Sequence, residues 1–209
     1  MATTPDIVRL ASQDLEWATD LLTRAFIEEP PTTHLFLGPR REAQVRYFMQ
    51  CTCAYTLHFG EAHATADRKA VALWLLPGET TMTPGRMYRA GMFAAPWRMG
   101  LRGFSRFMGF AGHTDKLHRV AAPMPHYYLF ALGVDPAAQG QGLGGALVRH
   151  MLSRADREGV PTYLETQCER NVALYERLGF GVAGRGPFPH LTGLDNWGML
   201  RPTRITRHH

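Results

Sequence analysis

The sequence predicts a domain of the mixed α/β class, and three observations carry that prediction. Residues 126–134, HYYLFALGV, form an apolar run typical of a buried strand. Residues 143–159 place apolar side chains at helical spacing directly after a glycine-rich loop. Strand-like and helix-like patterns alternate along the rest of the chain, whose 209 residues suffice for one domain with its own core.

The N-terminal elements follow from apolar spacing and from breakers. Residues 6–12 predict a first strand that ends at a helix with Ser12 as its N-cap. One face of that helix carries Leu15, Ala18, Leu22 and Ala25. The helix must end before Pro30 and Pro31, because proline cannot continue it. A second helix is expected from about residue 40 to 59.

Two neighbouring strands are expected over residues 61–67 and 69–76, joined by a turn at Asp67–Arg68. Residues 82–119 are rich in methionine and aromatic side chains and are interrupted by glycine and proline, which predicts an insertion of kinked helices. Its arginines at 98, 102 and 106 recur every fourth residue. Such a stripe is typical of the solvated face of a core helix, and a membrane-surface helix is the alternative.

The same segment can also form the floor of an adaptable ligand pocket, because methionine and aromatic side chains suit such surfaces. The positions that we expect to select which ligand this pocket binds are Phe93, Phe104, Phe107 and Met108. After residues 126–134 and 143–159, further strands are expected over 160–166, 180–184 and 196–202. A short helix over 171–179 closes at Gly179. The domain is expected to span residues 1–204, with a disordered tail over 205–209.

Composition and charge indicate which kinds of partner the protein binds. The net charge is +5 and the isoelectric point about 9.4. Without long basic runs, zinc-finger spacing or a helix-turn-helix signal, a phosphate-rich cofactor explains this charge better than nucleic acid does. The three cysteines, at 51, 53 and 168, make neither a disulfide framework nor a metal site. No signal peptide and no membrane span is expected, so the protein is interpreted as cytoplasmic, without nucleic-acid, membrane or metal partners.

The loop QGQGLGGAL, residues 139–147, fits two phosphate-binding motifs. One is the dinucleotide motif G-x-G-x-x-G, and the other is the acyl-CoA motif Q-x-x-G-x-G. A dinucleotide loop follows its strand at once, whereas five residues separate Val134 from Gly140 here. In addition, only 44 residues remain after Glu165, too few for the further parallel strands of that fold. The acyl-CoA motif fits, because exposed amides at a helix start bind anions.

Together, ALGVDPAAQGQGLGGALV, YLET and RNVALYERLGF resemble the GNAT acetyltransferase superfamily, and within it the puromycin N-acetyltransferases and their relatives. The likeness is strongest from about residue 127 to 180 and weakest over 82–119. It implies the GNAT acyltransferase fold, a mixed and mostly antiparallel central sheet flanked by helices, with a helical insertion on the acceptor side over about 82–119.

The resemblance also implies roles for individual residues. Backbone groups of Leu132, Gly133 and Val134 would hold the pantetheine arm. The pyrophosphate would lie on the loop that comprises Gln139, Gly140, Gln141, Gly142, Leu143, Gly144 and Gly145. Asn171 would contact the pantetheine, and Tyr175 would be the general acid. Many members carry asparagine seven residues before that tyrosine, where this chain has Cys168.

The implied activity is transfer of an acetyl group from acetyl-CoA to the primary amine of a small molecule, by direct attack in a ternary complex. A drug-like or aminoacyl-nucleoside-like amine fits the likeness, as in antibiotic resistance. Acetylation of a protein N-terminus or lysine, and a catalytically silent acyl-CoA-binding module, are the alternatives. Glu165 is the first candidate base because a buried strand end raises a carboxyl pKa; Glu29, His34 and His126 are others. The acceptor, the base and the choice between monomer and homodimer stay open.

Overall fold

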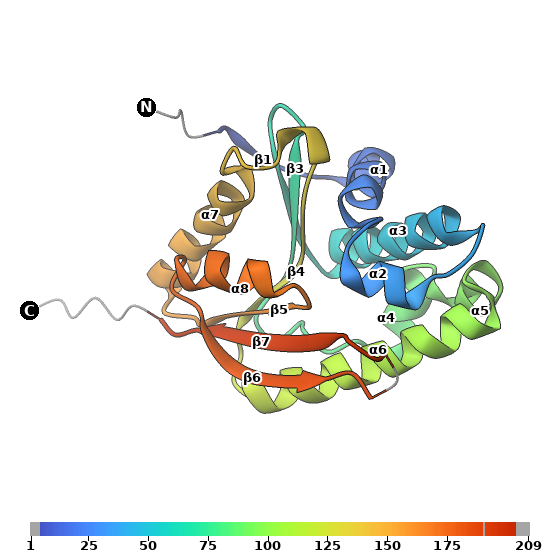
Figure 1. The fold of residues 1–209 in the computed structure, drawn as a ribbon. Coiled ribbons are helices and arrows are strands. Elements are labelled where there is room, and N and C mark those ends of the chain that lie inside the picture. The colour runs from blue at the N-terminus through green and yellow to red at the C-terminus, as the bar shows by residue number, and fades with distance from the viewer. Residues whose placement is uncertain (1–4, 190, 204–209) are drawn as a thin grey trace, which may run out of the picture.

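The computed structural model describes residues 5–189 and 191–203, and its elements are labelled in Figure 1. The first half of the chain contains β1 (Ile7–Arg9), η1 (Ser12–Asp14), α1 (Leu15–Phe26), α2 (Pro30–Leu35), α3 (Arg41–Phe59), β2 (Gly60–Thr65) and β3 (Ala70–Leu75). The middle segment contains α4 (Pro84–Arg89), η2 (Met92–Ala94), α5 (Ala95–Arg98) and α6 (Gly100–Ala121). The last part contains β4 (Tyr127–Val134), η3 (Pro136–Ala138), α7 (Leu143–Glu158), β5 (Thr162–Thr166), α8 (Glu169–Glu176), β6 (Gly181–Pro187) and β7 (Asp195–Arg201).

The described strands form one seven-stranded sheet in the order β1-β2-β3-β4-β5-β7-β6. Neighbouring strands are antiparallel except β4 and β5, which are parallel. This is the mixed, mostly antiparallel sheet that the resemblance implies. Helices cover both faces, with α7 and α8 on one side and α1, α3 and α6 on the other (Figure 1).

The alternation of side chains along the strands explains the two cores. On β3, Val71 and Leu73 face the cluster with α1 and α3, whereas Ala72 and Trp74 face the cluster with α7. Because both faces are covered, every residue of β3 is buried, and the strand is a continuous apolar run instead of an alternating one. The sheet therefore separates two layers of helices.

Strand β4 contains a β-bulge that its sequence does not predict. Its register against β3 shifts so that Leu73 pairs with Ala131 and Trp74 with Leu129, which leaves Phe130 as an extra residue. Such a bulge sends two successive side chains to one face. Accordingly Phe130 and Ala131 both pack beside the α1 and α3 cluster, and Leu132 returns to the α7 side.

Beyond the bulge, β4 and β5 separate. Their pairing joins Tyr127–Leu129 to Thr162–Leu164 and includes no later residue of either described strand. Residues 131–134 of β4 still pair with β3, so their other edge faces an opening in the middle of the sheet. In Figure 1 this opening lies between β4 and β5, with α7, α8 and α2 around it.

Most expected elements agree with the structure, and one cap is wrong. The turn at Asp67–Arg68 joins β2 and β3, as predicted, with Arg68 at a φ of 57°. Ser12 does not cap α1, because residues 12–14 form the short helix η1 and α1 begins at Leu15. The Asp14 carboxylate instead accepts a hydrogen bond from the Ala11 amide at 3.0 Å. The two prolines separate α1 from α2, which begins at Pro30 because proline is favoured in a first turn. The expected tail, 205–209, lies outside the described residues.

Candidate active site

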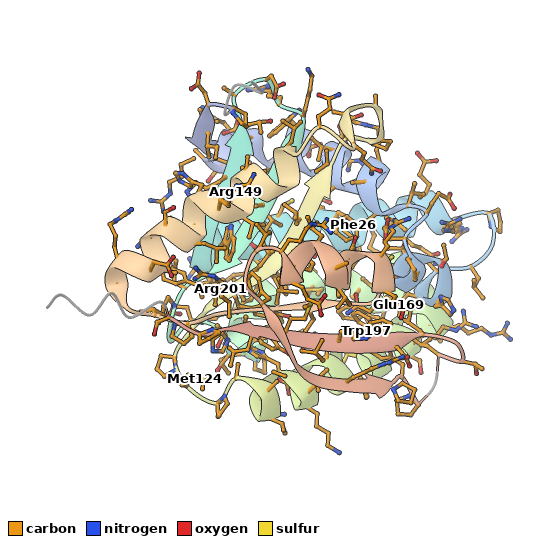
Figure 2. The ribbon with its side chains drawn as sticks, turned by 60° about the vertical axis from the view of Figure 1, so that its left-hand side comes forward. Phe26, Met124, Arg149, Glu169, Trp197 and Arg201 are labelled. Carbon is orange, nitrogen blue, oxygen red and sulfur yellow. The ribbon has the colours of Figure 1, made fainter. Side chains whose placement is uncertain are left out.

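A cleft of about 700 Å³ occupies the opening between β4 and β5. Its walls come from the open edge of β4, the loop before α7, the end of β5, one face of α8 and the α1–α2 connection. Figure 2 labels Phe26 at the end of α1 and Glu169 at the start of α8 on one side of β4, and Arg149 of α7 on the other. The cleft therefore runs from the loop before α7 toward the α1–α2 connection.

The glycine-rich loop forms one end of this cleft. Gly140 and Gly142 have φ values of 80° and 78°, in the left-handed region where only glycine is unstrained. A Cβ at either position would meet nothing within 4 Å, so backbone conformation, and not crowding, requires these glycines. Gly142 is the N-cap of the 16-residue helix α7, whose first residues line the cleft and carry the positive end of the helix dipole.

Two further glycines bring the surrounding elements close together. A Cβ at Gly133 would lie 2.4 Å from Leu22 and 3.2 Å from Ala25, so glycine lets α1 pack directly on β4. A Cβ at Gly144 would lie 3.3 Å from Val134 and 3.4 Å from Leu132. These contacts fix the loop against the open edge of β4, and they give Gly133 a packing role beside the backbone role that the resemblance implies.

Tyr175 lies on the face of α8 that lines the cleft, and it is buried against Phe180 and the α7 cluster. Burial, and to a lesser degree the charge of the Glu29 carboxylate, raises the pKa of Tyr175 above its ordinary value. Its hydroxyl makes no hydrogen bond to any described residue. The phenol is therefore protonated at neutral pH and keeps its proton available for a ligand in the cleft.

Glu165 lies near the end of β5, where its side chain reaches the cleft. Its Oε1 accepts a hydrogen bond of 2.8 Å from the Tyr163 hydroxyl, whereas its Oε2 is buried with no partner among the described residues. Burial raises the pKa of Glu165 to about 8, against the opposing effects of the Tyr163 hydroxyl and the nearby Asn196 amide. The group can therefore exchange a proton near neutral pH.

A second carboxylate lies across the cleft from α8. Glu29, the N-cap of α2, forms an ion pair with Arg170 of α8, so this pair joins two walls of the cleft. The Glu29 side chain is mostly buried, whereas that of Arg170 is exposed. The described cleft thus holds two acidic side chains, Glu29 and Glu165, and of these Glu29 lies close enough to Tyr175 to raise its pKa.

The cleft brings together most of the residues to which the resemblance gives a role. Lining it are Leu132, Gly133, Val134, Gln139, Gly140, Gly142, Leu143, Gly144, Gly145, Glu165, Cys168, Asn171 and Tyr175. Gln141 is exposed and does not line it. The Asn171 side-chain amide lies 3.5 Å from the Thr166 hydroxyl, and Cys168 is the N-cap residue of α8.

Two alternative bases lie away from the cleft. The His34 ring nitrogen Nδ1 is 2.7 Å from the Pro30 carbonyl oxygen in α2. His126 is buried, with its Nε2 2.7 Å from His118 Nε2 and its Nδ1 2.6 Å from the Met124 carbonyl oxygen. Burial lowers the pKa of His118 and of His126. Of the candidate bases, Glu165 and Glu29 are the two that line the cleft.

The middle segment does not line this cleft, contrary to expectation. Phe107 is a core residue, and Phe104 packs against the same core, which includes α3. Phe93 and Met108 are largely exposed on the outer surface. The reason is that α6 packs on β6, β7 and α2, with Phe107 against Phe48 of α3, and that its remaining apolar side chains face outward.

Sequence reasoning missed several cleft residues, among them Phe26, Pro31, Gln167, Arg170 and Leu174. A helical-face signal was available for α8, because Arg170, Asn171, Leu174 and Tyr175 recur at intervals of three and four residues. No such signal joins α8 to the α1–α2 connection, which is some 140 residues away. Among the described residues, no group of three histidine, cysteine or acidic side chains could hold a metal ion.

Comparisons with known proteins agree with this geometry. Residues 88–180 match the sequence model of the Acetyltransferase (GNAT) family. The N-alpha-acetyltransferase RimI of Mycobacterium tuberculosis is 37% identical over 106 residues, which cover 49% of this chain and 64% of that relative. The matched region therefore spans less than two thirds of that relative's length.

Two solved structures share the whole architecture. One is a histone acetyltransferase HPA2 and related acetyltransferase from Corynebacterium glutamicum, with a TM-score of 0.70 at 22% identity over 98% of this chain and 99% of that one. The other is the Drosophila melanogaster polyamine N acetyltransferase, with a TM-score of 0.62 at 18% identity over 93% and 98% of the two chains. At such identities the likeness concerns the fold alone.

Proposed function

We propose that this chain, whose residues 88–180 match the GNAT acetyltransferase family model, transfers the acetyl group of acetyl-CoA to the primary amine of a small molecule. The proposal includes direct attack of the amine in a ternary complex. One observation carries it: a single cleft between β4 and β5 is lined by a glycine-rich loop at a helix N-terminus, by a protonated phenol and by two acidic side chains. The closer likeness to puromycin N-acetyltransferases stays a prediction.

The wall of the cleft fits the long, polar arm of acetyl-CoA. Residues 130–134 of β4 lack a strand neighbour on the β5 side, so an extended amide chain can pair there as an added strand. The pyrophosphate then reaches the amides at the start of α7. Arg149 and Arg177 extend this positive region, because Arg177 lines the cleft and the Arg149 guanidinium lies beside Gly145.

Tyr175 is suited to act as the general acid. Its raised pKa keeps the phenol protonated, and its hydroxyl has no competing partner among the described residues. When the thioester bond breaks, a proton donated by this hydroxyl neutralises the departing thiolate. Such proton transfer typically contributes about 10²–10⁴-fold to the rate. The backbone amides of β4 around Leu132 are suited to stabilise the developing oxyanion.

Glu165 is suited to act as the base that removes a proton from the attacking amine. Its Oε2 accepts no hydrogen bond of normal geometry from the described residues, and its pKa of about 8 gives a carboxylate that is basic enough to accept a proton from an ammonium group. Glu29 is suited to attract the amine, since a cationic acceptor can replace the exposed guanidinium of Arg170 beside it. The two carboxylates therefore favour an acceptor that arrives as a cation.

A small acceptor is also supported by the connection between β6 and β7. Phe188 stacks on Phe110 of α6, with ring centroids 4.8 Å apart, and Leu191 and Leu194 belong to the same core as α2. This connection therefore packs beside α2 and leaves less room there for an extended peptide. The named activity of the RimI relative nevertheless favours a second candidate, acetylation of a protein N-terminus.

Thiol release from acetyl-CoA, measured across a panel of small primary amines and a peptide with a free N-terminal alanine, tests both candidates. Saturable release with small amines, and none with the peptide, is the expected result. Turnover of the peptide alone would replace the first candidate with the second. Heat of acetyl-CoA binding with no turnover on any acceptor would indicate a silent acyl-CoA-binding module, and no binding at all would overturn the proposal.

A further inference from the structure

The surface of α4, η2, α5 and the start of α6 carries an unusual set of exposed apolar side chains. Trp97 and Leu101 are 79% and 78% exposed, and Tyr88 and Phe93 are 66% and 61% exposed. These four are here called the apolar patch. The Tyr88 and Phe93 rings are in contact, with centroids 5.2 Å apart. Contiguous exposed aromatic and aliphatic surface usually marks an interaction site.

The same stretch is strongly positive. Residues 80–114 contain five arginines and no aspartate or glutamate. Three of these arginines, Arg89, Arg98 and Arg102, are exposed, and they form no ion pair with any described residue. Arg89 lies over the Phe59 ring and Arg98 over the Tyr47 ring, both of α3, so aromatic faces and not carboxylates are their neighbours. These three are here called the basic set.

The exposed face of α6 continues the pattern. Leu101, Ser105 and Met108 recur at helical spacing and are all exposed, whereas Gly103 and Phe107 are buried. The sequence favours a solvated polar face for this helix, and the structure instead exposes leucine and methionine beside arginine. In Figure 1, α5 and the start of α6 lie at the edge of the molecule opposite α7, so this surface is separate from the anion-binding loop.

We propose that the apolar patch and the basic set together form a docking surface for an anionic lipid membrane. Tryptophan, tyrosine and leucine enter the interfacial region of a bilayer, and arginines nearby attract its anionic headgroups. A second copy of the chain fits less well, because a two-fold contact would bring like arginine charges together. Nucleic acid would use the arginines but would leave the exposed leucine and methionine side chains unexplained.

The surface serves peripheral contact with the membrane. No described helix is long and apolar enough to cross a bilayer. Binding by exposed side chains of short helices is instead shallow and reversible, and it depends on the charge of the lipid. Each arginine near an anionic surface contributes attraction that corresponds to about a fivefold change in affinity. The inference does not rest on the proposed function, because the surface lies outside the cleft.

Co-sedimentation of the full chain with vesicles tests the proposal. Vesicles of phosphatidylcholine alone are compared with vesicles that also contain phosphatidylglycerol, at low and high salt. The expected result is binding to the anionic vesicles only, with loss of binding at high salt because surface attraction is screened. Equal binding to both kinds of vesicle, or to neither, would overturn the proposal.

Three variants locate the surface. Joint substitution Arg89→Gln, Arg98→Gln and Arg102→Gln is expected to weaken anionic-vesicle binding by about 100-fold. Trp97→Ser with Leu101→Ser is expected to reduce binding to the anionic vesicles, measured by the same co-sedimentation. A control with Lys69→Gln, Lys116→Gln and Arg157→Gln removes three exposed charges elsewhere and should bind like wild type.

Four further measurements make the outcome decisive. All of these side chains are exposed, and thermal melting of each variant checks that the fold is kept. Sedimentation without lipid reports self-association, and an apolar-patch-dependent dimer in place of vesicle binding would overturn the proposal. Salt-sensitive binding to a single-stranded oligonucleotide in place of anionic vesicles would overturn it too. Thiol release from acetyl-CoA is measured in parallel, so that failure of one proposal is distinguished from failure of the other.

Discussion

The Tyr163 hydroxyl donates a hydrogen bond of 2.8 Å to Glu165 Oε1, whereas Oε2 is buried without a hydrogen bond from any described residue. Gly198 of β7, opposite Glu165 in the sheet, leaves room for this hydroxyl, because a Cβ there would lie 2.6 Å from it. The carboxylate is thus oriented on one oxygen and available on the other. Its chemistry should therefore depend on pH in a defined direction.

For Glu165, we predict that kcat/KM rises with pH and levels off above about pH 8, because burial raises the pKa of this base to about 8 and only the deprotonated form accepts a proton. Glu165→Gln should remove this rise and lower the rate about 10²-fold or more. The raised pKa of Glu165 also makes the free energy of unfolding depend on pH. A raised folded-state pKa stabilises the fold below the ordinary carboxyl pKa, and this contribution is lost as pH rises through 8. The variant should therefore gain stability relative to wild type at pH 9 and not at pH 4.

For Tyr175, we predict that substitution by phenylalanine lowers kcat about 10²-fold and changes the KM for acetyl-CoA little. The ring and its contact with Phe180 remain, and only the phenolic proton is lost. Because the hydroxyl makes no hydrogen bond to a described residue, the melting temperature should stay within a degree or so of wild type. Tyr88→Phe, at an exposed site outside the cleft, is the matched control. An unchanged single-turnover rate would return Tyr175 to a packing role.

For Gly142, we predict that glutamate abolishes acetyl-CoA binding while the fold survives. The new side chain costs about 1–2 kcal/mol of left-handed backbone strain and places negative charge on the anion-binding loop. Gly159→Glu is the matched control, since Gly159 has a φ of 67° at the other end of α7 and equal free space. Both variants should lose similar stability. Calorimetry should show binding to the control alone, and equal affinity for both would remove the loop from the site.

For Arg149 and Arg177, we predict a role in selecting the 3′-phosphate of CoA. Both lie beside the α7–α8 end of the cleft and form no ion pair with any described residue. Joint substitution by glutamine should weaken CoA binding about 10- to 100-fold and leave dephospho-CoA binding almost unchanged, as expected for lost charged hydrogen bonds. Arg157→Gln, exposed near the far end of α7, is the control. Titration calorimetry with both ligands measures the effect, and equal losses for the two would contradict it.

Much of the fold could be predicted from local pattern. Residues 126–134 and 143–159 match β4 and α7 within one residue, because a continuous apolar run and a helical apolar period are strong signals. The prediction of Ser12 as the N-cap of α1 was wrong because η1 lies before α1. The Asp14 carboxylate there accepts the hydrogen bond from the Ala11 amide. The bulge at Phe130 left no trace in sequence, since it depends on the register with β3.

The candidate site divides in the same way. The loop and Tyr175 could be predicted because their residues lie close together in sequence and carry a motif. The Glu29–Arg170 pair joins residues 141 positions apart, so no spacing announces it. The middle segment misled for a physical reason: apolar side chains suit a pocket, a core or an interface equally, and only packing distinguishes Phe107 in the core from Trp97 on the surface.

The short pairing between β4 and β5 affects how readily the protein opens locally and is degraded. Of the described residues, Tyr127–Leu129 and Thr162–Leu164 alone join the two half-sheets directly, so the row of amides beyond them is the natural place for local opening. A ligand that bridges the half-sheets closes this seam, and its binding energy is added to the stability of the fold: about 2.7 kcal/mol at a hundredfold excess over Kd. Resistance to heat and proteolysis therefore rises with the concentration of that ligand, and the chain is degraded more readily when the ligand is scarce.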